Sequence, residues 1–176
     1  NAHLLAVAPN ASSSIICGNT SPSIEPYRAN AFTQKTKSGS SLLKNEYLEH
    51  ALQELDQDTD EVWKSIITNS GSVQHLDFLD DWTKDVFKTA VEIDQRYIIE
   101  MAADRQKEIC QSQSLNVFFP ANVSKQELHA IHMMAWKKKV KTLYYLRSEA
   151  IKRAETVSDE ALRQYIFESM DDEGCL

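Results

Sequence analysis

Two adjacent tyrosines, Tyr144 and Tyr145, are the residues of this chain whose type and spacing most suggest chemistry. A phenol can lose an electron and a proton together. Two neighbouring phenols therefore suit the stepwise transfer of a radical over a distance too long for a single transfer. The residues alone leave a structural alternative open, because aromatic residues are enriched in strands and neighbouring strand positions alternate between faces. In that alternative, one ring belongs to the core and the other to the surface.

A second candidate lies near the start of the chain, at Asn10, Ala11, Ser12 and Ser13. The apolar run 4–8 before it is typical of a fully buried strand, and residues 12–17 predict a short helix whose first turn is rich in hydroxyls. A strand, a tight turn and a helix start present free backbone N–H groups at a positive dipole end, which can bind an anion without lysine. Simple N-capping by serine is the structural alternative.

Other common kinds of site find little support. His129 and His132 lie three positions apart on an expected helix, but a carboxylate-bridged metal bundle needs repeated Glu-x-x-His units, which the chain lacks. Glu46 and His50 have the wrong spacing for such a unit. No nucleophile elbow is present, and the four glycines are not spaced as in a phosphate-binding loop. Ordinary surface or half-buried histidines are the interpretation we adopt.

Length and composition restrict the class of protein. A chain of 176 residues can bury one sizeable core, and its net charge of −7 argues against nucleic acid as a partner. The apolar run 4–8 is too short to span a membrane. Cys17, Cys110 and Cys175 fit neither a disulfide framework nor zinc-ligand spacing, which favours a reducing cytoplasm. The chain begins with Asn and already predicts a strand there, so we expect a piece of a longer protein without a signal peptide.

Apolar periodicity and capping residues predict the elements that position these candidates. A hairpin is expected from strands at 31–37 and 41–44 around Ser38-Gly39-Ser40. A short strand is expected at 115–119, followed by a helix at 124–138, where Ser124 and Glu127 have capping-box spacing. That helix leads into a short extended run that ends in the two tyrosines. The remaining predicted helices are 46–55, 61–68, one opened by residues 80–81, and 93–109.

Several runs of residues resemble one known family. Lys-Thr-Leu-Tyr-Tyr-Leu-Arg at 141–147, directly after a helix, resembles the C-terminal end of the large catalytic subunit of class I ribonucleotide reductase. The run 9–14 resembles the substrate-phosphate loop of the same subunit. Further runs that look like this subunit are 23–27, 94–97, 101–105 and Gln-Ser-Gln-Ser-Leu-Asn at 111–116. The similarity covers about residues 1–150.

The resemblance implies an α/β fold, namely the C-terminal segment of the ten-stranded α/β barrel of ribonucleotide reductase. This segment would be incomplete on its own and largely helical with short strands. Residues 1–150 would form the C-terminal part of the barrel domain, and residues 151–176 a mobile C-terminal tail, with one or two loosely attached helices in 148–170. Family members reduce ribonucleoside diphosphates to deoxyribonucleoside diphosphates by a radical mechanism.

The resemblance also implies roles for individual residues. Asn10, Ala11, Ser12 and Ser13 would hold the substrate diphosphate, mostly through backbone N–H groups, since some members carry other side chains at Ala11 and Ser12. Tyr144 would lie next to the active-site cysteine, and Tyr145 would face the small subunit. The helix 124–138 would help to form the groove for the C-terminal tail of the small subunit. Cys175 lies where the first cysteine of a redox-active tail pair is expected.

The implied partners follow from these roles. They are the N-terminal portion of the large subunit, the small (beta) radical-generating subunit, a second large subunit in a homodimer, thioredoxin or glutaredoxin, and a ribonucleoside diphosphate. This segment itself would bind no cofactor or metal, since the di-metal radical centre belongs to the small subunit and allosteric nucleotides bind outside the segment. We expect no nucleic acid and no membrane as partners.

Departures from the family pattern lead to one further expectation. The thiyl-forming cysteine and the redox-active cysteine pair belong upstream of Asn1, while Cys17 and Cys110 match no catalytic position. The tail has one cysteine, Cys175, where two are expected. We therefore expect the chain to be inactive without an N-terminal portion. A non-catalytic interaction module that retains the fold is the alternative.

Overall fold

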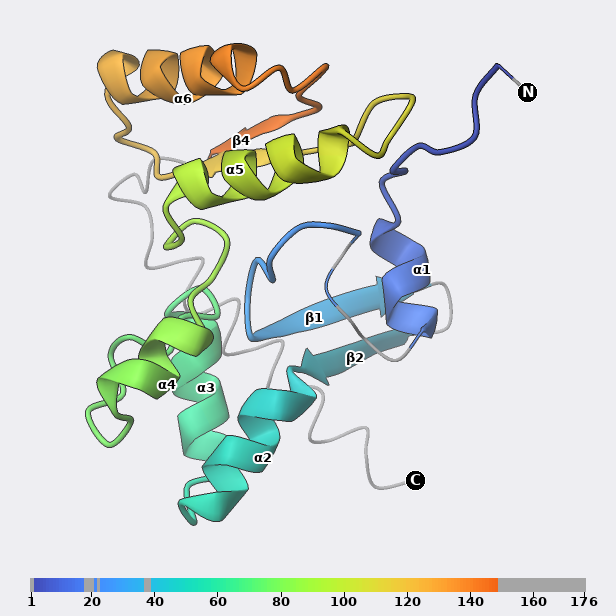
Figure 1. Ribbon diagram of the computed structural model, residues 1–176. Coiled ribbons are helices and arrows are strands. Elements are labelled where there is room, and N and C mark those ends of the chain that lie inside the picture. Colours follow the sequence, from blue (N-terminus) through green and yellow to red (C-terminus); the bar gives the residue numbers. More distant parts are fainter. Residues whose placement is uncertain (1, 18–20, 22, 37–38, 149–176) are drawn as a thin grey trace. The chain divides into compact units, whose positions relative to one another are not determined.

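A computed structural model describes residues 2–17, 21, 23–36 and 39–148, which divide into two compact units (Figure 1). Unit 1 comprises the described residues up to Tyr27 and those from Ala90 to Ser148. Unit 2 comprises the described residues from Arg28 to Thr89. Each unit has its own hydrophobic cluster, where the chain length had suggested a single core.

Unit 2 consists of a hairpin followed by short helices. Strand β1 (Ala31–Thr36) pairs antiparallel with β2 (Gly39–Lys44), which confirms the predicted hairpin. The helices are α2 (Glu46–Glu54), α3 (Asp60–Thr68) and α4 (Asp81–Val86). Each begins after a polar side chain that accepts a hydrogen bond from a first-turn N–H, these residues being Asn45, Thr59 and Asp80. The three predicted helices of this unit are confirmed.

Buried hydrogen bonds hold together the loops that connect the strands and helices of unit 2. The Asn30 side-chain amide donates to the carbonyl oxygens of Gly71 (3.0 Å) and Phe87 (2.8 Å), and its oxygen accepts from the Asn45 amide (3.0 Å). Gly71 lies against Ala29 and has a φ of +81°. The apolar core around this network includes Leu48, Leu52, Trp63, Ile66 and Val73.

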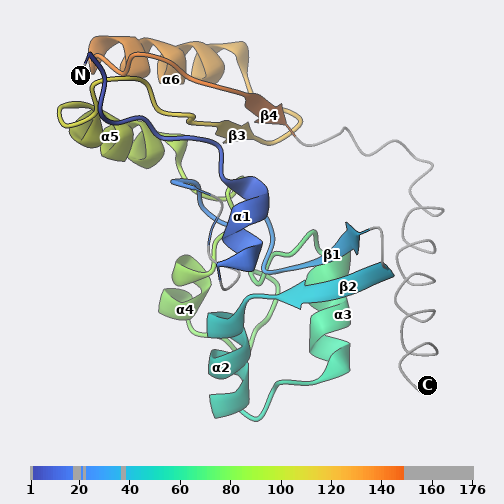
Figure 2. The same ribbon diagram turned by 90° about the vertical axis from the view of Figure 1, so that its right-hand side faces the viewer.

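Unit 1 contains the chain ends of the described structure. Its elements are α1 (Ala11–Ile16), α5 (Gln95–Gln106), β3 (Val117–Phe119), α6 (Lys125–Lys137) and β4 (Leu146–Ser148). Strands β3 and β4 are parallel, with Val117 opposite Leu146, and α6 forms the crossover between them. Helices α5 and α6 lie side by side, and β3 and β4 lie next to each other in both views (Figures 1 and 2).

Two predictions for unit 1 need correction. The run 4–8 is extended and pairs through Val7 with Gln113, but Leu4 is 73% exposed, so the prediction of a fully buried strand is wrong. Residues 4–7 bond to residues 110–114, and the Ala8 carbonyl accepts from the Ser23 hydroxyl, but these backbone contacts leave the apolar side chains uncovered. The helix predicted at 93–109 is shorter. The Asp94 side chain caps its start, and after Gln106 the chain folds back as the Gln106 amide donates to the carbonyls of Ile109 and Gln111.

The other helix predictions of unit 1 hold to within one residue at each end. Residues 12–17 were predicted and α1 is Ala11–Ile16, while 124–138 were predicted and α6 is Lys125–Lys137. The predicted tail and its helices, with Cys175, lie outside the described residues. Among the described residues, no helix combines the length and the apolar character needed to cross a membrane.

Candidate functional site

The tyrosine pair lies immediately before β4 and is held against the segment that leads into β3. The Tyr144 N–H donates to the Leu115 carbonyl (2.8 Å), and the Val117 N–H donates to the Tyr145 carbonyl (3.0 Å). The centroids of the two phenol rings are 4.2 Å apart, with the ring planes tilted by 48°. Each tyrosine is 50% exposed. The alternative of one core ring and one surface ring is therefore wrong.

The backbone at the pair explains why the rings do not alternate between faces. In a regular strand, successive N–H groups point to opposite edges and successive side chains to opposite faces. Here the N–H groups of both tyrosines point to the same segment, because Tyr144 donates to Leu115 and Tyr145 donates to the Asn116 side-chain oxygen (2.9 Å). Regular pairing begins only at Leu146. The irregular backbone brings both rings to one side, where they make a tilted ring contact.

The two phenols also influence each other electrostatically. A side-chain hydrogen bond with Tyr145, followed by charge interaction with that phenol and desolvation, raises the pKa of Tyr144, while Arg147 opposes the shift. As for any un-ionised phenol, oxidation of the Tyr144 ring to a neutral radical at neutral pH releases a proton as well as an electron.

A cation lies over the second ring of the pair. The guanidinium carbon of Arg147 is 5.0 Å from the centroid of the Tyr145 ring, within the range of a cation–π interaction. The Arg147 Nε is buried and has no hydrogen-bond partner among the described residues. The charge of Arg147 is thus held next to the ring of Tyr145.

The candidate anion loop lies at the start of α1. The Asn10 carbonyl accepts from the Ser14 N–H (3.2 Å), and the Asn10 side chain makes no capping hydrogen bond. The Ser13 hydroxyl lies 3.5 Å from the Asn10 carbonyl oxygen. The first-turn N–H groups of Ala11, Ser12 and Ser13 have no partner inside the helix, as at any helix start. The start of α1 thus has the free N–H groups that are common to all helix starts.

One segment carries both candidates. Val7, three residues before Asn10, donates to the Ser112 carbonyl (3.2 Å) and accepts from the Ser114 N–H (2.9 Å). The next residues of the same segment, 115–117, bind the tyrosine pair. Lys141 fixes the start of the segment, since its ammonium lies 2.6 to 3.2 Å from the carbonyl oxygens of residues 109–111. The anion loop and the tyrosines are thus attached to one stretch of unit 1.

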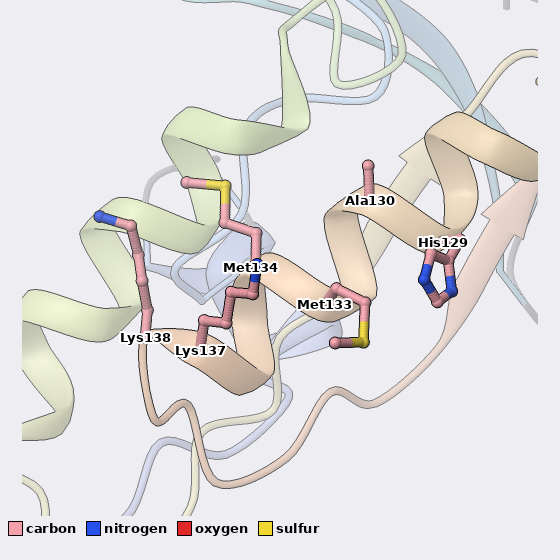
Figure 3. A pocket seen from close by; sticks show the side chains of 6 residues that line it. All are labelled: His129, Ala130, Met133, Met134, Lys137 and Lys138. Carbon is pink, nitrogen blue, oxygen red and sulfur yellow. The ribbon is translucent and has the colours of Figure 1, made fainter.

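Helix α6 carries a pocket on its surface, with a volume of about 540 Å³ (Figure 3). Its lining comes from consecutive turns of the helix: His129, Ala130, Met133, Met134, Lys137 and Lys138. Thioether side chains and a basic end give this face both adaptable apolar surface and positive charge. Lys138 also pairs with Glu100 of α5 at 3.2 Å.

The structure places the histidines of α6 and two of the cysteines. The described residues contain no group of three or more His, Cys, Asp and Glu that could hold a metal ion. A ring nitrogen of His132 lies 2.7 Å from the Leu128 carbonyl, within its own helix. Cys17 and Cys110 are free and exposed. Hydrogen bonds from the N–H groups of Leu5 and Leu4 lower the pKa of the Cys110 thiol.

Residue patterns alone did not single out the groups that hold the tyrosines. Asn116 binds the Tyr145 N–H, and the Glu25 carboxylate accepts from the Asn116 N–H (3.2 Å). Both residues are buried, at 4% and 5% exposure. The family resemblance could have pointed to these two residues, because Glu25 and Asn116 lie within the runs 23–27 and 111–116 that carry it.

Comparison with known proteins identifies the family. The family model described as "Ribonucleotide reductase, barrel domain" matches residues 1–146. The chain belongs to this family. The described strands form two-stranded sheets and do not close a barrel, as expected of a segment of the ribonucleotide reductase fold.

Relatives from viruses and animals agree with this assignment. The chain is 56% identical over 158 residues to the ribonucleoside-diphosphate reductase large subunit of Invertebrate iridescent virus 6. The aligned region covers 88% of the chain and 16% of that protein. It is 39% identical over 187 residues to the large subunit of Caenorhabditis elegans, covering 100% of the chain and 23% of that protein. The chain thus spans about a fifth of the length of these relatives.

A solved structure is similar as well. The class Id ribonucleotide reductase alpha subunit of Actinobacillus ureae matches with a TM-score of 0.73 and 42% sequence identity. The match covers 81% of this chain and 26% of that subunit. The ribonucleotide reductase fold of the chain therefore rests on sequence and on structure.

Proposed function

We propose that this chain supplies the C-terminal part of a ribonucleotide reductase catalytic subunit, which reduces ribonucleoside diphosphates to deoxyribonucleoside diphosphates. The observation that carries the proposal is the stacked, half-exposed pair of Tyr144 and Tyr145. Two phenols in ring contact and open to partners are suited to pass a radical from one protein surface to a reaction centre. The chain acts together with an N-terminal portion of the large subunit, which carries the reaction centre, and with the small subunit.

In this proposal the pair relays a radical in three balanced transfers. Tyr145 loses an electron and a proton towards the radical of the small subunit. Tyr145 then regains both from Tyr144, which in turn regains them from the cysteine thiol of the upstream portion. Stacked rings support the exchange within the pair because their centroids are only 4.2 Å apart.

The test replaces Tyr144 by Phe in an enzyme reconstituted from this chain, the upstream portion and the small subunit. Because Phe keeps the ring but cannot form a phenoxyl radical, we expect loss of diphosphate reduction, measured as deoxyribonucleotide formed. Tyr97→Phe is the matched control, since Tyr97 is an exposed tyrosine of the same unit that takes no part in the pair. Full turnover by Tyr144→Phe would support the alternative of a non-catalytic interaction module.

The start of α1 is proposed to hold the substrate diphosphate through the N–H groups of Ala11, Ser12 and Ser13, with Asn10 at the cap. A first-turn proline removes one N–H donor with little disturbance of the helix. Ser13→Pro should therefore weaken diphosphate binding at least several-fold, whereas Ser13→Ala, which keeps the N–H, should bind as the wild type does. Equal affinity of the two variants in a calorimetric titration would contradict this assignment.

The pocketed face of α6 is proposed as part of the groove for the C-terminal tail of the small subunit. Its methionines can adapt to apolar side chains of a tail, and Lys137 adds positive charge that favours an acidic one. Met133→Glu places a negative charge in the pocket and should weaken binding of a synthetic tail peptide. Unchanged binding in a fluorescence titration would remove α6 from the docking surface.

Cys175, outside the described residues, is proposed to exchange electrons with thioredoxin or glutaredoxin. Its thiolate would attack the active-site disulfide to form a mixed disulfide and release one thiolate. The two thiols of thioredoxin or glutaredoxin would then reduce the mixed disulfide and become a disulfide themselves. Cys175→Ser should lower thioredoxin-dependent turnover and leave turnover with a small dithiol unaffected. Equal losses with both reductants would contradict a shuttle role. A homodimer of the large subunit and a cytoplasmic location complete the proposal.

A further inference from the structure

We infer that Asn116, held in place by Glu25, is a positioning residue for the tyrosine relay. The inference rests on the proposed function and extends it to residues that touch neither substrate nor the reacting rings. Asn116 lies on the segment entering β3, and its side-chain oxygen accepts the Tyr145 N–H at 2.9 Å.

The stack requires a backbone that a regular strand cannot supply. Regular pairing with the 115–117 segment would turn the N–H groups of Tyr144 and Tyr145 to opposite edges and their rings to opposite faces. Instead both N–H groups point to this segment, and the Val117 N–H binds the Tyr145 carbonyl. A regular ladder offers a backbone partner at this place to the N–H of only one residue. Here two adjacent residues, Tyr144 and Tyr145, both direct an N–H to it, as in a β-bulge.

The Asn116 side chain supplies the missing partner. The Leu115 carbonyl is occupied by Tyr144, and the Tyr145 N–H is satisfied by a side-chain oxygen in place of a backbone carbonyl. A half-buried N–H without a partner is costly, so removal of this oxygen favours a return to regular pairing. Regular pairing would separate the two rings. Asn116 thus stabilises the backbone conformation on which the 4.2 Å ring contact depends.

Glu25 fixes Asn116 in turn. Its carboxylate accepts the Asn116 N–H at 3.2 Å, and both residues are almost completely buried. A hydrogen bond to a carboxylate is stronger than one between neutral groups. Glu25 lies 91 residues before Asn116, in a segment that is itself tied to the rest of unit 1 by the hydrogen bond from the Ala90 N–H to the Tyr27 carbonyl (2.7 Å). The position of Tyr145 therefore depends on a chain of two buried polar residues.

The experiment measures kcat and KM for a ribonucleoside diphosphate in the reconstituted enzyme. Asn116→Leu removes the accepting oxygen at similar size. It should lower kcat by about 10- to 100-fold, the range expected when reacting groups shift by about an ångström, while KM stays within about two-fold. Glu25→Leu should act in the same direction, and Glu25→Gln, which retains an accepting oxygen, should restore most of the activity.

A matched variant separates positioning from general destabilisation. Gln95 is a buried amide of the same unit that bonds to Ala90, Ile93 and Phe118 and makes no bond to the tyrosines. Gln95→Leu should lower the melting temperature about as much as Asn116→Leu but reduce kcat much less. Asn116→Ser, whose hydroxyl is too short to reach the Tyr145 N–H, replaces the leucine variant if that variant fails to assemble.

The outcomes distinguish this inference from the proposed function. Wild-type kcat for both Asn116 variants, together with an inactive Tyr144→Phe, would overturn the positioning role alone. Equal losses of kcat in Asn116→Leu and Gln95→Leu would also overturn it. Full turnover by Tyr144→Phe would overturn the proposed function and the positioning role together.

Discussion

The helix starts of unit 2 and the tyrosine pair of unit 1 satisfy their polar groups over very different distances along the chain. In unit 2, first-turn N–H groups of the helices and the buried indole N–H of Trp63 donate hydrogen bonds to side chains only two to five positions away. In unit 1 the tyrosine pair depends on Asn116, 29 residues before Tyr145, and on Glu25, 91 residues before Asn116. The candidate chemistry thus depends on contacts between remote segments, as does the buried Asn30 network of unit 2.

The difference has a physical basis. A helix cap or a hairpin needs only a few neighbouring residues in the right conformations, so local sequence determines it. A stacked pair of rings beside a parallel strand needs several segments at once, because parallel strands must be joined by long crossovers. Substitutions at local caps should therefore disturb local stability, and substitutions in the contacts of the tyrosine pair should disturb the geometry of a distant site.

The largest effect on stability is expected from Gly71→Ala in unit 2. A Cβ at Gly71 would lie 2.3 Å from the Ala29 Cβ and 2.5 Å from the Ala29 Cα, and the φ of +81° disfavours side chains. Because backbone must move, we expect a loss of about 3 kcal/mol or more in the free energy of unfolding, measured with urea.

Gly39→Ala is the matched control for this prediction. Gly39 also has a positive φ, of +141°, but nothing lies within 4 Å of an added Cβ. The strain of the backbone alone should cost about 1 kcal/mol. Equal losses for the two variants would show that the close contact between Gly71 and Ala29 does not limit the stability of unit 2.

A smaller effect on stability is expected from Lys141→Met in unit 1, where it also tests the dependence on remote segments. The variant keeps the apolar stem of Lys141 but removes its hydrogen bonds to the carbonyls of residues 109–111. Since Lys141 is exposed, we expect a loss of about 1 to 2 kcal/mol. Hydrogen exchange at the Gln111 N–H, which binds the Leu5 carbonyl, should become faster. Unchanged exchange there, or the same change in Lys137→Met, would contradict a clamping role.

Sequence patterns predicted most of unit 2 and the helices of unit 1, because those signals are local. The hairpin, the three helices of unit 2 and α6 all lie within two residues of their predicted bounds. The family resemblance pointed to Tyr144 and Tyr145, and the family itself is now established by comparison. The roles of those tyrosines and of the α1 loop remain predictions.

What sequence could not supply was the irregular backbone. Alternation predicts opposite faces for Tyr144 and Tyr145, and only the bond from the Tyr145 N–H to Asn116 reveals why both rings lie together. The end of α5 was missed for a related reason. The Gln106 side chain, otherwise compatible with a helix, binds the carbonyls of Ile109 and Gln111 and folds the chain back. In each case a side chain takes the place of a backbone group in a hydrogen bond. The periodicity of apolar residues in the sequence does not detect such a replacement.

A pH-dependent effect of about 1 kcal/mol is expected in unit 2 from Asp58→Ala. Hydrogen bonds from the Trp63 indole (2.7 Å) and then the Gln53 amide (3.1 Å) lower the pKa of Asp58 below its ordinary value. A carboxyl with a lowered folded-state pKa stabilises the fold above the unfolded-state pKa. That stabilisation is lost as the pH falls through the folded-state pKa.

The difference in unfolding free energy between wild type and Asp58→Ala should therefore be full at pH 7 and shrink below about pH 4. Asp77→Ala, at an exposed carboxyl of the same unit, should show little difference at either pH. A difference for Asp58→Ala that stays constant from pH 7 to pH 2.5 would mean that the ionised form of Asp58 contributes nothing to the stability of unit 2.

The smallest effect is expected at Ser124, where unit 1 uses the local kind of contact typical of unit 2. The Ser124 hydroxyl oxygen accepts the Glu127 N–H at 3.0 Å and caps α6. Ser124→Ala should cost somewhat less than 1 kcal/mol, towards the lower end for an N-cap, because this helix start is exposed. Ser124→Asp, which restores an accepting oxygen and adds a favourable charge at the helix start, should recover or exceed wild-type stability.

Ser124→Ala also tests whether local contacts in unit 1 affect the tyrosine pair. Because Asn116 and Glu25 hold Tyr145 independently of the α6 cap, kcat should remain within about two-fold of wild type despite the fraying of the first turn. A loss of kcat comparable to that of Asn116→Leu would show that the cap and the pair are coupled through the β3–α6–β4 crossover. The separation between local and remote contacts in unit 1 would then not hold.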